Sequence, residues 1–212
     1  MSTLNPPSCE IRIGTSGYAY HDWEGILYPK GCGPSNYLLY YSKRFSTIEL
    51  KMGLQSCIKY RDMKKLLDES RKTLDFAIRV GLPPNVISYA THTNDIFEII
   101  RGTLAPIAEA NRLYSLLLSF PDSYHYGIEE RKFLSKLISN FFMFPVAVEF
   151  NNNEWNSVRV IEGLKERQIS LCIHATPAAE TTSLSFDIVT SPRAYIRFRD
   201  ISESLGNEAE KG

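Results

Sequence analysis

Residues 144–155 read FPVAVEFNNNEW. Its large apolar side chains occupy every second position up to Phe150, which is the pattern of a β-strand with one apolar face. That face is expected to pack against helices. Glu149 belongs to the alternate face and comes near the carboxyl end of the strand, so its role depends on what the other strands place beside it.

Six further short apolar runs are expected to form strands, at residues 11–14, 46–50, 74–80, 114–120, 169–174 and 194–199. Helical periodicity separates most of them, around residues 37–45, 60–67, 94–107, 133–138 and 158–164. Ser35 is a candidate cap of the first helix, and Asn156 or Ser157 of the last. The segment between His174 and Ala194 has no clear helical pattern.

Strands that alternate with helices predict right-handed βαβ units and a parallel sheet. The spacing suits a TIM-type (β/α) barrel with seven strands, and an open doubly wound sheet is the alternative. Because no linker or low-complexity stretch divides the chain, residues 1–212 are expected to form a single domain. Its ordered core is expected at about residues 10–200, followed by a polar tail at 201–212.

The alternation within each strand predicts which side chains face the barrel interior. Seven of them are polar or charged: Arg12, Glu49, Arg79, Ser119, Glu149, His174 and Arg197. Because parallel strands end at one mouth, most of this set should meet there. Buried charges must neutralise one another or a ligand, so the set predicts either a binding site or a core filled by ion pairs.

Composition excludes several classes of protein. The chain carries 24 basic and 24 acidic residues, so no overall field favours nucleic acid. The four cysteines form no C-x-x-C pair, which disfavours a zinc ribbon or a thioredoxin-type motif. The first ten residues lack the features of a signal peptide, and no apolar run has the roughly 20 residues of a membrane span. We therefore expect a cytoplasmic protein without a membrane partner.

The stretch IRIGTSGYAYHDWEGILYPKG at residues 11–31 resembles the opening of the YecE-like family of uncharacterised TIM-barrel proteins. Matches follow in order, from YLLYYSKRFSTIEL and DFAIRV to LLLSFPDSY, VAVEFNNNEW and AYIRFRD. The resemblance covers about residues 11–199 and implies a barrel fold.

Departures from the family pattern fall on the mouth. Lys51 stands where an asparagine is expected, Arg79 replaces a lysine, and Ser119 replaces a glutamine. Asn151 and Asn152 replace an arginine and a histidine. The family's eighth strand is missing, so a homo-oligomer is a candidate for covering the open edge of the barrel.

Glu49 and Glu149 are the candidates for general acid–base catalysis at the mouth. The expected partner is a small anionic or phosphorylated ligand, because arginine forks match such groups. The candidate ligand-binding residues are Arg12, Ser16, Tyr18, Arg79, Ser119, Asn151, Trp155, His174 and Arg197. No cofactor and no metal are expected; a divalent metal on the two glutamates and His174 is the weaker alternative.

Three function classes remain open from the sequence. The first is an enzyme-like barrel, with hydrolase or isomerase chemistry. The second is a degenerate binding or scaffold protein, which the replaced family positions favour. The third is a protein that binds or processes nucleic acid, against which the neutral charge weighs weakly.

Overall fold

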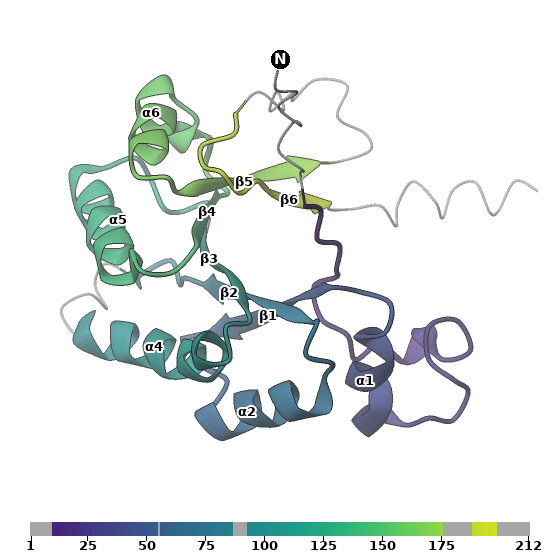
Figure 1. The fold of residues 1–212 in the computed structure, drawn as a ribbon. Coiled ribbons are helices and arrows are strands. Elements are labelled where there is room, and N and C mark those ends of the chain that lie inside the picture. The colour runs from purple at the N-terminus through teal and green to yellow at the C-terminus, as the bar shows by residue number, and fades with distance from the viewer. Residues whose placement is uncertain (1–9, 55, 87–92, 176–187, 199–212) are drawn as a thin grey trace, which may run out of the picture.

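The protein is built around a sheet of parallel strands. The computed structural model describes residues 10–54, 56–86, 93–175 and 188–198. Within them, six parallel strands lie side by side in chain order (Figure 1). These strands are β1 (Thr47–Gly53), β2 (Asp75–Gly81), β3 (Leu113–Phe120), β4 (Val146–Phe150), β5 (Ser170–Ala175) and β6 (Tyr195–Phe198). Each of them falls on a stretch that the alternation of apolar residues predicted.

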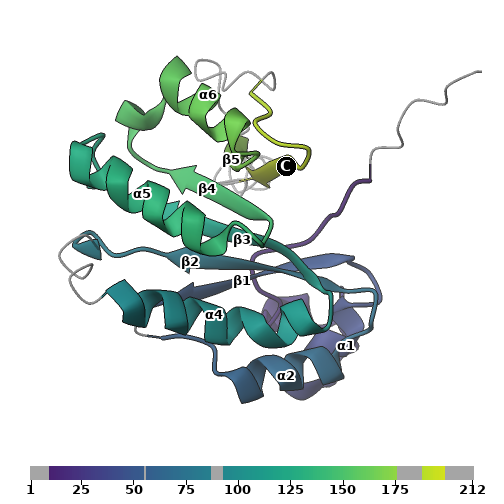
Figure 2. The same ribbon diagram turned by 60° about the vertical axis from the view of Figure 1, so that its left-hand side comes forward.

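The helices follow the strands. They are α1 (Tyr37–Tyr41), α2 (Tyr60–Glu69), α4 (Thr93–Glu109), α5 (Ile128–Phe141) and α6 (Val158–Glu166), with short 3₁₀ turns η1 (His21–Trp23), η2 (Pro34–Asn36) and η4 (Asn153–Trp155). From α2 to α6 they cover one face of the sheet, as Figures 1 and 2 show. None of the helices in the described part of the chain has the length and apolar character that a membrane span needs.

The expectation of a seven-stranded TIM-type barrel is wrong. The sheet is an open half-barrel, in which β1 and β6 are the edges and do not pair with each other. The register is regular between β1 and β2 and between β3 and β4, but it shifts between Phe76 and Ala77 where β2 pairs with β3. β4 pairs with β5 over only two residue pairs. The described strands therefore form a curved α/β sheet that is open on one side (Figure 1).

The missing strand is the one expected at residues 11–14. Ile11 and Ile13 are 75% and 65% exposed, so no apolar burial holds this segment in a strand. The chain forms a β-bridge with the sheet only farther on, between Ser16 and Glu49. There the amide of Glu49 donates to the carbonyl of Thr15 at 2.9 Å, and the amide of Gly17 donates to the carbonyl of Glu49 at 2.8 Å.

The helix predictions hold for all five periodic stretches, with one cap misassigned. The side chain of Ser157 accepts a hydrogen bond from the amide of Val160, so it caps α6 as expected. Ser35 does not cap α1, because it lies inside η2 and α1 has no side-chain cap. The segment expected to be a loop between His174 and Ala194 lies largely outside the described residues, as does the expected polar tail.

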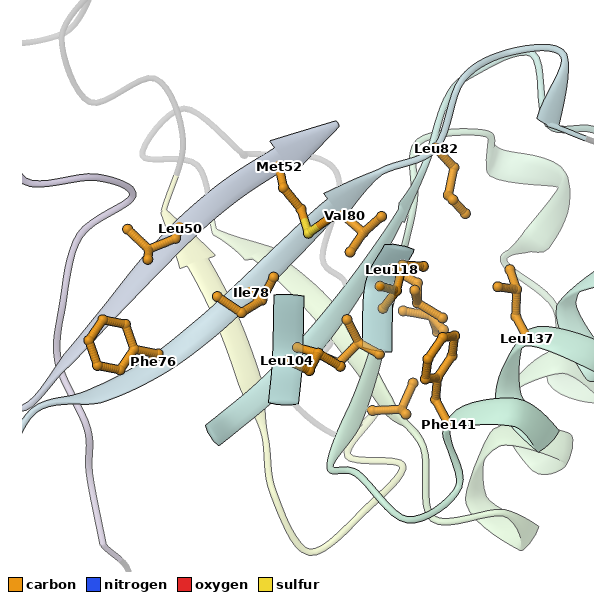
Figure 3. Close-up of a cluster of buried hydrophobic side chains, with 14 of the residues drawn as sticks. Leu50, Met52, Phe76, Ile78, Val80, Leu82, Leu104, Leu118, Leu137 and Phe141 are labelled. Carbon is orange, nitrogen blue, oxygen red and sulfur yellow. The ribbon is translucent and has the colours of Figure 1, made fainter. Parts of the chain in front are cut away.

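The main core lies between the sheet and its helices. Ile78, Leu118 and Phe141 are fully buried there, and Figure 3 shows side chains of α4 and α5 meeting the strands. Burial of one such side chain contributes about 1.5–3 kcal/mol. This packing fixes which face of each strand is turned toward the helices.

The inner face of the half-barrel has an apolar lower layer and a polar upper layer. Leu117, Ala147 and Cys172 form a small buried cluster, against which Tyr195 packs. The next inward-facing residue toward the carboxyl end of each of these strands is polar. On β4 this residue is Glu149, two positions after Ala147. The apolar layer therefore separates the polar residues of the mouth from the far end of the sheet.

Candidate functional site

Strand register brings the polar residues of the mouth together. Ser119 on β3 lies opposite Glu149 on β4, and His174 on β5 lies opposite Arg197 on β6. Because all strands are parallel, these positions lie at the same edge of the sheet. The alternation of residues in the sequence therefore correctly predicted the convergence of these four side chains.

Glu149 lies at the centre of this cluster and is fully buried. His174 Nε2 is 2.7 Å from its Oε1, and Arg197 Nη1 is 2.5 Å from the same oxygen. The other oxygen, Oε2, accepts from Ser119 Oγ and from Arg79, whose Nε is 3.2 Å away. The carboxylate therefore has donors on both oxygens.

These donors determine the ionisation of Glu149. Burial by itself opposes the charged form, but hydrogen bonds from His174, Ser119 and Arg197 outweigh it and lower the pKa of Glu149 well below its usual range. Glu149 is thus an anion at neutral pH. A fully buried carboxylate that is ionised at neutral pH is suited to orienting a neighbour rather than to exchanging protons with a ligand.

Arg197 connects the two glutamates. Its Nε is 3.1 Å from Glu49 Oε2, while its Nη1 binds Glu149. Burial disfavours the charged guanidinium, but the two carboxylates reverse this effect and raise the pKa of Arg197. Glu49 also accepts from Ser16 Oγ at 2.7 Å and from the hydroxyl of Tyr195 at 2.9 Å.

His174 is held by the buried carboxylate of Glu149. Because Glu149 is an anion, the hydrogen that they share lies on His174 Nε2, and in the neutral imidazole this leaves the lone pair on Nδ1. No described residue donates to that atom. The side chain is 21% exposed, compared with 0% for Glu149. A histidine that is oriented by a buried carboxylate and still reaches solvent has the arrangement of a general base.

Arg12 lies away from this cluster. Its Nη1 is 2.8 Å from Asp75 Oδ2, and Asp75 is the first residue of β2. Its Nη2 is 2.8 Å from Glu10 Oε1. The structure therefore puts Arg12 at the amino-terminal end of the sheet, opposite the mouth.

Three other candidate ligand-binding residues have packing or main-chain contacts. Trp155 is 3% exposed, stacks on Phe150 with ring centroids 4.5 Å apart, and donates to the carbonyl of Tyr124. Asn151 donates to the carbonyl of Phe120 at 2.9 Å. Tyr18 packs against the main core. The structure brings together Ser16, Glu49, Arg79, Ser119, Glu149, His174 and Arg197.

Two residues of the mouth were not among the predicted site residues. Tyr195 binds Glu49, and burial together with that carboxylate raises the pKa of Tyr195, so the phenol stays a donor. Lys51 shares the face of Glu49 because β1 continues to Gly53, beyond the expected end at residue 50. The continued alternation of Leu50 and Met52 was the signal for it.

Glu149, Cys172 and His174 form a possible set of metal ligands. Their ligand atoms lie within 4.8 Å of one another, and a carboxylate, a thiolate and an imidazole suit zinc. However, Glu149 is already paired with Arg79 and Arg197, whose positive charges repel a cation. The two guanidinium groups therefore oppose a metal ion at this position, and the expected absence of a metal stays a prediction.

The fold is shared with proteins of known structure. A crystal structure of a DUF72 family protein from Thermotoga maritima superimposes with a TM-score of 0.72 at 25% identity, covering 88% of this chain and 73% of the other. A DUF72 family protein from Enterococcus faecalis gives a TM-score of 0.71 at 20% identity, covering 89% and 70%. No curated protein matches the sequence significantly.

A family model matches most of the chain. Residues 12–210 fit the model described as "Protein of unknown function DUF72", in agreement with the resemblance to uncharacterised YecE-like proteins. The family description assigns no ligand and no reaction. The chain belongs to the DUF72 family.

Proposed function

We propose that this protein is an enzyme-like half-barrel that binds a small anion, a carboxylate or a phosphate group, at the carboxyl ends of its strands. In this proposal Lys51 and Arg79 attract the anion and His174 exchanges a proton with it. Glu149 orients His174, and Glu49 holds Arg197 in place. The proposal thus keeps both glutamates in the site but moves proton transfer to the histidine.

The observation that carries the proposal is the pairing of Lys51 with Arg79. The two residues lie directly opposite each other on β1 and β2, so two positive side chains start from neighbouring positions on one face. Like charges in such a cross-strand position are destabilising. Arg79 turns to Glu149, but Lys51 is exposed and no carboxylate of the described residues pairs with it.

The charge balance supports the same conclusion. Lys51, Arg79 and Arg197 face only two carboxylates, and the oxygens of both carboxylates already accept hydrogen bonds. An added anion would therefore meet a surplus of positive charge at the mouth. Phosphate and carboxylate groups are the anions that arginine and lysine side chains bind best.

Binding of inorganic phosphate tests this proposal. We expect millimolar phosphate to raise the melting temperature of the protein and Lys51→Met to abolish the rise. Lys165→Met, which removes an exposed lysine from α6, is the matched control. It corrects for the unspecific stabilisation that phosphate gives to any protein. An equal response of both variants would remove Lys51 from the site.

Turnover is tested separately. Wild type is expected to hydrolyse generic substrates such as p-nitrophenyl phosphate or p-nitrophenyl acetate, and His174→Gln to lose this activity while it still binds phosphate. The alternative is a non-catalytic binding protein, which the complete hydrogen bonding of Glu149 favours. Phosphate binding without any turnover would support that alternative.

A further inference from the structure

A basic groove lies on the surface outside the mouth. It has a volume of about 510 Å³ and runs between residues 25–30 and the end of α1. Its three charged side chains, Lys30, Lys43 and Arg44, are all basic and exposed. No carboxylate of the described residues forms an ion pair with any of them. In Figure 1 the loop that forms one side of the groove is drawn in purple beside α1.

The groove is held in shape by packing. The ring of Tyr28 is buried and stacks on Tyr37 of α1 with centroids 4.3 Å apart, which fixes the loop to the helix. The amide of Gly25 donates to the carbonyl of Tyr28 at 2.7 Å, and Gly25 has a φ of 83°, in the left-handed region. The loop thus offers a preformed surface, which lowers the entropic cost of binding.

A second groove of similar size does not have this surplus of positive charge. It has a volume of about 620 Å³ and lies beside the ends of α2 and α4. Its basic residues are balanced by an equal number of acidic ones, namely Lys64, Lys72 and Arg112 against Asp68, Asp75 and Glu109. Since the whole chain is neutral, three uncompensated cations around one groove are a local feature.

The apolar lining of the basic groove indicates the kind of partner. Ile26 is 86% exposed, and Leu27 lies beside it in the lining. The ammonium group of Lys43 lies 4.5 Å from the centre of the Tyr40 ring and covers one face of it, so that face is not open to a stacking base. Aliphatic side chains flanked by cations suit a peptide with acidic residues around an apolar one.

We propose that this groove docks an acidic peptide segment of a partner protein, with an apolar side chain against Ile26 and Leu27. Carboxylates of the segment would pair with Lys30, Lys43 and Arg44. This interaction is independent of anion binding at the mouth, because it uses none of the same residues.

A fluorescein-labelled octapeptide of glutamates with one central leucine tests the proposal by fluorescence polarisation. We expect binding to wild type, and a loss of at least about tenfold in affinity in Lys43→Glu/Arg44→Glu. Lys64→Glu/Lys72→Glu makes the same change of charge in the balanced groove and is expected to bind within about twofold of wild type. No binding to wild type below about 1 mM, or equal losses in both variants, would overturn the proposal.

Two further probes test the stated chemistry of the partner. An octapeptide without the leucine is expected to bind more weakly, and equal affinity would contradict the role of Ile26 and Leu27. A labelled twelve-nucleotide single-stranded DNA is expected to bind more weakly than the peptide. Tighter DNA binding that is lost in Lys43→Glu/Arg44→Glu would assign the groove to nucleic acid instead and overturn the proposal.

Discussion

Arg197 on β6 is ion-paired with Glu49 on β1, with Nε 3.1 Å from Oε2, so side chains link the two edges of the half-barrel where no backbone ladder does. The same guanidinium neutralises Glu149, which is fully buried. Arg197 therefore contributes both to the charge balance of the mouth and, together with the hydroxyl of Tyr195, to the link between the two edges. The functional proposal requires this arrangement, because Glu149 in turn orients His174.

Arg197→Met is expected to lower the free energy of unfolding by about 3–5 kcal/mol, because it leaves two carboxylates without their shared cation. Arg61→Met, which removes an arginine whose side chain is 96% exposed, should change it by less than about 0.5 kcal/mol. Urea denaturation of both variants measures the difference. If Arg197→Met unfolds at the urea concentration of wild type, the arginine does not hold the edges together.

The ionisation of Glu149 predicts how stability depends on pH. Its pKa is lower in the folded protein than the value of about 4.3 in an unfolded chain, so ionisation stabilises the fold above that value. This contribution is lost as the pH falls toward the folded pKa. The free energy of unfolding should therefore fall between about pH 5 and pH 3 more steeply in wild type than in Glu149→Gln.

Denaturation curves measured at several pH values test this expectation. Glu162→Gln removes an exposed carboxylate from α6 and should keep the pH dependence of wild type. If wild type and Glu149→Gln lose stability in parallel as the pH falls, folding does not lower the pKa of Glu149.

The residues that meet at the mouth could largely be predicted from the sequence, because strand alternation is a local property. The apolar alternation around Glu149 and Arg79 fixes which face each side chain takes, and parallel strands bring their ends together. Arg12 was misplaced because Ile11 and Ile13 have the same alternation. Their exposure shows that the pattern reflects no buried strand, and only the structure reveals this.

Properties that depend on tertiary contacts were not predictable. Trp155 follows a strand end, which suggested a ligand contact, but its ring is buried against Phe150. The role proposed for His174 depends on the pKa of Glu149, and that pKa depends on donors from three other strands. A sequence lists such donors but does not give their distances.

Gly14 is expected to be essential for docking the N-terminal segment against β1. A Cβ at this position would lie 2.0 Å from the carbonyl oxygen of Thr47, a main-chain atom that cannot move aside alone. Gly14→Ala should therefore destabilise the protein by about 1–3 kcal/mol. It should also speed amide exchange at Glu49, whose amide donates to the carbonyl of Thr15.

Gly102→Ala is the matched control for this substitution. Gly102 lies inside α4 with open space around its Cβ position, so alanine should stabilise the helix by about 0.5–1 kcal/mol. Opposite signs for the two variants would confirm the close approach at Gly14. Equal amide exchange at Glu49 in wild type and Gly14→Ala would contradict it.

Trp155 is expected to contribute to stability and not to ligand binding. Trp155→Ala should cost about 3–5 kcal/mol, because the ring is buried against Phe150 and its indole NH donates to the carbonyl of Tyr124. Trp155→Phe keeps most of the packing and should bind phosphate as wild type does. A large loss of phosphate affinity in a stable Trp155→Phe protein would show that Trp155 takes part in phosphate binding.

The open edge of the sheet predicts self-association. Ile196 and Phe198 lie on the face of β6 opposite to Arg197 and are 41% and 69% exposed, next to an edge without a further strand among the described residues. A second copy that covers these side chains would remove apolar surface from water, which contributes about 25 cal/mol of stabilisation per Å².

We therefore expect wild type to form a dimer at micromolar concentrations and Phe198→Lys to be monomeric. Phe142→Lys, which changes an equally exposed phenylalanine beyond α5, should remain dimeric. Analytical ultracentrifugation distinguishes these outcomes, and a wild type that stays monomeric to about 100 μM would show that no second copy covers the edge.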